Sequence, residues 1–176
     1  MNSVSKNLTV LTWTIYLILV IVAVSPFLYF LWPQSAAYFP PNDILTSYGG
    51  ADALVLWQKI LGLFVAALPN AMLCWALILV LKLIRFLKAG MWFDESCEKL
   101  SRKFSKVMLW FVFFQFIHRT LLVLVVTATR PTGEKELVIS FSSDDLFAIV
   151  PVIFALIFAH IISLAREQRE ELKQII

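Results

Sequence analysis

The stretch VMLWFVFFQFIHRTLLVLVVTAT, residues 107–129, decides the fold of this chain. Almost every residue in it is apolar, and about 20 helical residues rising about 1.5 Å each are enough to cross the hydrocarbon core of a bilayer. Three further apolar runs of this kind lie at residues 8–31, 60–81 and 146–164. The sequence therefore predicts an all-α membrane protein with four transmembrane helices.

The composition of the whole chain agrees with this class. Of its 176 residues, 60% are hydrophobic and 15% are charged, and the mean hydropathy of +0.83 lies outside the range of soluble domains. Four spans leave little chain for a second domain, so we expect residues 1–176 to form a single four-helix transmembrane bundle. The run 8–31 is longer than the core of a secretory signal and only Lys6 precedes it, which favours a retained first span over a cleaved signal.

Basic residues gather on one side of the predicted spans. Seven lie in the segment 82–106, three lie in 166–173, and Lys6 precedes the first span, whereas the opposite loops hold Lys59, Arg130 and Lys135. Short loops rich in Lys and Arg stay in the cytoplasm. The N and C termini are therefore both predicted to be cytoplasmic.

The segment between spans two and three is amphipathic. Gly90 can end one helix and Asp94 can cap the next, after which apolar positions recur at helical spacing among charged ones. This pattern predicts a helix lying on the cytoplasmic surface, either as a connector that anchors span three or as a docking surface for a cytoplasmic partner. The residues assigned to that docking surface are Phe93, Leu100, Arg102, Lys103 and Phe104.

The second outer loop precedes span four. Residues 137–141, LVISF, favour a short extracytoplasmic strand or hairpin. Ser142 or Ser143 can then cap span four, with Asp144 and Asp145 in its first turn, where the helix dipole favours negative charge.

Arg119 is a charged residue near the middle of the apolar stretch 107–129, so its guanidinium needs hydrogen-bond acceptors, water or an anion within the bilayer. Counting residues from the outer ends of the spans places Asn70 at the depth of Arg119, and Gln115 shares its helix face. Asp145 lies several ångströms further out. The candidate intramembrane cluster is Arg119, Asn70, Gln115, His118 and Asp145, acting either as structural bonding within the bundle or as a positive pocket for a small anion or lipid headgroup.

His118 and His160 could in principle ligate one haem or metal ion, which would require them to lie at nearly the same depth. Their depths in the predicted spans differ by about 10 Å. An interhelical hydrogen bond for each is the preferred interpretation. Nucleophile–base pairs, carboxylate dyads, phosphate-binding glycine loops and groove-reading helices do not occur in the sequence. We therefore expect no enzyme activity, no cofactor or metal, and no direct nucleic-acid binding, with membrane lipids as the surrounding partners.

Two longer motifs resemble a known family. The run LKAGMWFDES at 87–96, followed by the amphipathic segment, and the closing stretch from Ser140 to Leu172 are similar to the YoaS-type bacterial membrane proteins of domain-of-unknown-function family 2975. Asp94 stands where that family often has Ser or Thr. The resemblance implies a multi-pass protein of the bacterial inner membrane, without established activity, often encoded beside a small helix-turn-helix regulator.

Two functions follow as expectations. The first is a regulatory or sensory membrane protein that holds a small cytoplasmic helix-turn-helix protein at its inner surface. The alternative is a small-anion or lipid-binding protein, or a transporter subunit, with its pocket around Arg119.

Overall fold

The computed structural model describes residues 2–32, 45, 47, 49–91, 94–131 and 143–175. This part of the chain contains four long helices, α1 (Asn2–Leu31), α3 (Leu56–Lys88), α4 (Glu95–Thr127) and α5 (Ser143–Ile175), and a short 3₁₀ helix η2 (Ala51–Ala53). All four long helices are long and apolar enough to cross a membrane. The predicted all-α, multi-pass membrane fold is confirmed, while the strand or hairpin expected at 137–141 lies outside the described residues.

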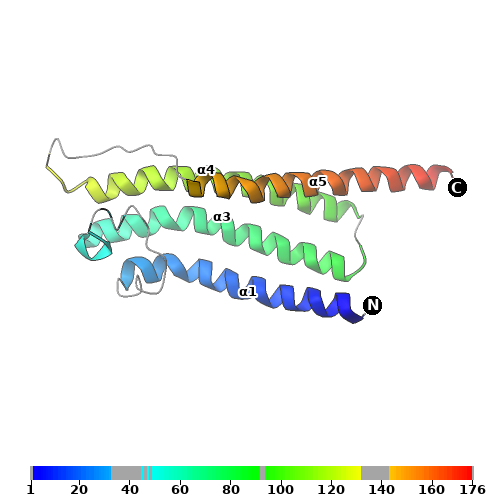
Figure 1. The fold of residues 1–176 in the computed structure, drawn as a ribbon, viewed down its shortest axis with the longest axis horizontal. Helices are drawn as coiled ribbons and strands as arrows, with labels where there is room; N and C mark the ends of the chain where they lie inside the picture. Colours follow the sequence, from blue (N-terminus) through cyan, green and yellow to red (C-terminus); the bar gives the residue numbers. More distant parts are fainter. Residues whose placement is uncertain are drawn as a thin grey trace.

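The helices pack side by side in chain order (Figure 1). α3 lies between α1 and α4, and α5 packs on α4. The start of α1, the end of α3, the start of α4 and the end of α5 lie at one end of the bundle, which we call the terminal end. The end of α1, the start of α3 and the end of α4 lie at the opposite end, the loop end. This arrangement brings together the segments that the basic residues assign to one side of the membrane.

The turn between α3 and α4 forms as the sequence predicts. Gly90 has a φ of +75°, and the backbone N–H groups of Gly90 and Met91 donate to the carbonyls of Leu87 and Phe86. This left-handed glycine closure satisfies carbonyls that the end of a helix would otherwise leave without partners. Asp94 then takes the N-cap position of α4, and a hydrogen bond with the Ser96 side chain lowers the pKa of its carboxyl group.

The prediction of a separate surface helix before span three is wrong. α4 runs without interruption from Glu95 to Thr127, because neither glycine nor proline occurs between these residues. Its first turns are also buried inside the bundle on one face, which carries Cys97, Ser101 and Ser105. The amphipathic segment is therefore the terminal end of span three itself.

The interior consists of apolar clusters that follow the helices from end to end. At the loop end, Phe30 of α1 packs with Ala66 of α3 and Leu122 of α4. The approach of α1 to α3 is close there, because a Cβ added to Gly62 would lie 2.5 Å from the Phe30 ring. Nearer the terminal end, α3, α4 and α5 meet around Leu79, Met108 and Ala155. Many large apolar side chains face outward, as expected of helices whose solvent is lipid.

Candidate functional site

Among the described residues at the loop end, Gln58 in the first turn of α3 makes the densest set of interhelical hydrogen bonds. Its side chain is buried, and its Nε2 donates to the carbonyls of Val125 at 2.8 Å and Val126 at 3.1 Å, in the last turn of α4. Its Oε1 accepts from the backbone N–H of Val55 at 3.1 Å. One amide thus satisfies groups at the start of α3 and at the end of α4, a role that the sequence reasoning missed.

These contacts also fix the register of α3 against α4. Gln58 lies opposite Val126, so Val65, seven residues further along α3, lies level with Arg119, seven residues back along α4. Pro69 leaves the carbonyl of Val65 without its helical donor. The half-buried Arg119 is therefore level with a backbone carbonyl that lacks its helical bond, which favours the structural interpretation of this residue.

Asn70 and Asp145, which the sequence places at or outside the depth of Arg119, lie deeper in the bundle than predicted. The same register places Asn70 five residues, or about 7 Å, beyond the level of Arg119. The contacts of Ser105 with Ala155 and of Glu98 with Arg166 place the backbone of Asp145 level with the α4 turn from Gln115 to Arg119. Asp145 is thus further from the loop end than the span boundaries suggest, and its side chain lies outside the described residues.

His118 is half-buried on α4, next to Arg119, and His160 is exposed on α5. The contacts of Arg102 with Ser163 and of Ser105 with Ala155 put His160 level with residues 100–105 of α4, at least about 20 Å from His118 along the bundle. One haem cannot be held by both rings. Among the described residues no group of three His, Cys, Asp or Glu side chains is placed to hold a metal ion.

The residues assigned to partner docking divide into two groups. Leu100 and Phe104 pack against the core between α3, α4 and α5, so their side chains contribute to the bundle itself. Lys103 holds its Nζ 5.4 Å from the centre of the Trp75 ring of α3. Arg102 is exposed and pairs with Glu98, while Phe93 lies outside the described residues.

A charged network joins α4 to α5 at the terminal end. Glu98 is its centre: one carboxylate oxygen lies 2.7 Å from Arg102 Nη2 and the other lies 2.7 Å from Arg166 Nη1. The Ser163 hydroxyl donates to Glu98 at 3.1 Å and accepts from Arg102 at 3.0 Å. The Glu98 side chain is only 13% exposed, so its charge is compensated within the protein. We call Glu98, Arg102, Ser163 and Arg166 the α4–α5 clamp.

The sequence carried a weak signal for this clamp. Ser163 and Arg166 are three residues apart, so they share one face of a helix, and Ser163 interrupts an apolar run. Glu98 is one of the charged positions of the amphipathic segment, and the packing of α5 beside it cannot be seen in the pattern of α4 alone.

Beyond the clamp, α5 continues past the end of its neighbour (Figure 1). Arg166 lies level with Glu98, only three residues after the start of α4, whereas α5 extends nine residues further to Ile175. The contact of Ser105 with Ala155 shifts α5 about four residues further, so the overhang is about six to ten residues, or about 9 to 15 Å. Exposed residues of this α5 extension include Glu167, Glu171 and Leu172.

The fold and the terminal-end site together define a multi-pass helical membrane protein with a charged helical extension at one end. Comparisons with known proteins add no relative, since no family model, curated protein or solved structure matches this chain. The resemblance to the YoaS-type family therefore stays a prediction.

Proposed function

We propose that this chain is a regulatory membrane protein that binds a cytoplasmic protein partner at its terminal end. The observation that carries the proposal is the α5 extension, which projects past α4 and is anchored to it by the Glu98–Arg166 ion pair. In the predicted topology this end faces the cytoplasm of a bacterium, with the bundle in the inner membrane. The role needs no catalytic group.

The clamp supports a way for the membrane part to influence the partner. α5 contacts α4 through small and polar groups, including the Ser105 hydroxyl that donates to the Ala155 carbonyl at 2.7 Å. Because the extension continues the same helix, a change in the packing of α5 on α4 redirects the extension. A signal in the bilayer or at the loop end would then alter the surface offered to the partner.

The chemistry of the extension favours a protein partner. Arg166 pairs with Glu170 at 2.8 Å, which leaves Glu167 and Glu171 exposed on one helix face, four residues apart. Leu172 is 62% exposed on the adjoining face, next to Gln168 and Arg169 and about 12 Å past the end of the apolar run at 164. An acidic helix face adjoining an exposed apolar side chain suits a partner with a basic surface and an apolar pocket. From the family resemblance, we expect a small helix-turn-helix regulator.

A site-specific photocrosslinker at Leu172 tests this proposal in bacterial membranes. The expected result is an adduct with a soluble helix-turn-helix protein, identified by mass spectrometry, that is lost when Glu167→Lys and Glu171→Lys are combined. The same crosslinker at Ile153, which is exposed on the apolar part of α5, is the matched control and should yield no such adduct. The proposal fails if both positions give the same adducts, or if charge reversal leaves the Leu172 adduct unchanged.

A further inference from the structure

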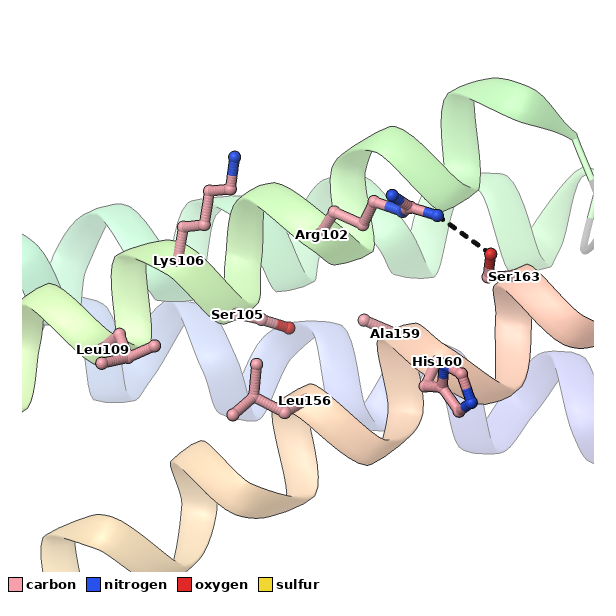
Figure 2. A pocket seen from close by; sticks show the side chains of 8 residues that line it. All are labelled: Arg102, Ser105, Lys106, Leu109, Leu156, Ala159, His160 and Ser163. Carbon is pink, nitrogen blue, oxygen red and sulfur yellow. Dashed lines mark hydrogen bonds between the residues drawn. The ribbon is translucent and has the colours of Figure 1, made fainter.

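A groove lies between α4 and α5 next to the clamp (Figure 2). Its volume is about 370 Å³. α4 contributes Arg102, Ser105, Lys106 and Leu109, and α5 contributes Leu156, Ala159, His160 and Ser163. The predicted pocket around Arg119 is a different place, because Lys106 lies thirteen residues, or about 20 Å, nearer the terminal end.

The lining changes from polar to apolar along the bundle axis. Arg102 and Ser163 lie nearest the terminal end and are joined by a hydrogen bond of 3.0 Å, with Lys106 and His160 following. Leu109 lies furthest toward the middle of the bundle, Leu156 lies beside Ser105 at nearly the level of Lys106, and each leucine is about half exposed. From Ser163 to Leu156 this gradient extends over about 10 Å of helix.

The charge of the groove is positive. Arg102 and Lys106 stand on the same side of α4, one turn apart, and no Asp or Glu is among the eight lining residues. Glu98 pairs with Arg102, but the Arg102 side chain remains 61% exposed, so its other N–H groups stay accessible. The Lys106 side chain is exposed as well. An occupant must therefore supply negative charge at the terminal end and apolar surface further in.

We propose that this groove binds an anionic phospholipid of the leaflet at the terminal end. The phosphodiester would lie at Arg102 and Lys106, and one acyl chain would run over Leu156 and Leu109. This order of charge followed by hydrocarbon matches the order of a phospholipid along the membrane normal. A soluble anion would satisfy the two cations but would leave the apolar half exposed.

Native mass spectrometry of the full chain tests the proposal, with micelles that contain equal amounts of phosphatidylglycerol and phosphatidylcholine. The protein should retain phosphatidylglycerol in preference. Lys106→Gln should lower that retention about fivefold, the usual contribution of one lysine near an anionic headgroup. Lys82→Gln is the matched control, because Lys82 is exposed on α3 at the level of Arg102 but is not part of the groove.

Two further arms distinguish a bound phospholipid from a free anion at the two cations. Leu156→Trp keeps both cations and fills the apolar half, so it should also lower phosphatidylglycerol retention while leaving the far-ultraviolet spectrum of the bundle unchanged. Excess inorganic phosphate should not displace the lipid. The proposal would be overturned by equal retention of the two lipids, or by an equal loss of phosphatidylglycerol retention in Lys106→Gln and Lys82→Gln. It would also be overturned by full phosphatidylglycerol retention in Leu156→Trp, or by displacement of the lipid by phosphate.

Discussion

Replacing Gln58 by methionine is expected to lower the free energy of unfolding by about 2 to 3 kcal/mol. The substitution nearly preserves side-chain volume but removes three hydrogen bonds: the one accepted from the Val55 N–H, and those of the two amide N–H groups, which the Val125 carbonyl, the Val126 carbonyl and the Thr129 hydroxyl share. At about 0.6 kcal/mol for each hydrogen bond between membrane helices, the three bonds contribute about 2 kcal/mol. At about 1 kcal/mol each, the figure typical of soluble proteins, they contribute about 3 kcal/mol.

The measurement is unfolding of the detergent-solubilised chain by titration with sodium dodecyl sulfate, followed by tryptophan fluorescence. Gln168→Met makes the same chemical change at an exposed helical position and should leave the midpoint of the transition unchanged. If Gln58→Met costs less than about 0.5 kcal/mol, or no more than Gln168→Met, the buried amide does not hold α3 to α4 as argued.

Three further outcomes follow from the packing. Gly62→Ala should lower the free energy of unfolding by about 1 to 3 kcal/mol in the same titration, because its new Cβ would lie 2.5 Å from the Phe30 ring. In a Phe30→Leu background the same substitution should cost much less. An equal loss of unfolding free energy in both backgrounds would contradict the clash. Cys97 is fully buried, so a membrane-impermeant maleimide should label it only after unfolding. By contrast, Ser96→Cys in an otherwise cysteine-free chain should be labelled in inside-out vesicles, and labelling in intact cells would invert the predicted orientation. Glu98→Gln should raise amide hydrogen exchange across 166–172 about fivefold, as expected for an ion-pair network whose arginines remain partly exposed. Unchanged exchange would show that the clamp does not order the extension.

The number and order of the helices could be predicted because runs of apolar residues report directly on burial in lipid. The helix boundaries could not, because hydropathy does not mark where a helix ends. α4 begins at Glu95, well before the apolar run at 107, and α5 continues to Ile175, well past the run that ends at 164. Helical hydrogen bonding continues through charged residues wherever glycine and proline are absent. The turn at Gly90 was predictable, because a glycine that ends a helix is recognisable from the residues next to it in the sequence.

The axial register of the helices was the information that the sequence lacked. Depths counted from span ends assume that all four apolar runs begin at one level. The contact of Ser105 with Ala155 places α5 further toward the terminal end than that assumption does, and Gln58 places Asn70 deeper than Arg119. The same displacement brings Ser163 beside Glu98, which is why the clamp was not foreseen. Register depends on contacts between residues far apart in the chain, and no pattern within one helix encodes it.

Arg102 connects the two proposals, because it belongs to both the clamp and the groove. A phosphodiester bound at Arg102 and Lys106 competes with the Glu98 carboxylate for the same guanidinium, and any N–H group that turns to the lipid weakens the clamp. Adding phosphatidylglycerol to the micelles should then raise hydrogen exchange across the extension at 166–172 in the unsubstituted chain. Lys106→Gln should reduce that response, since Lys106 takes no part in the clamp. A rise of equal size in both proteins would mean that the lipid acts through the general surface charge, and the groove and the extension would then function independently.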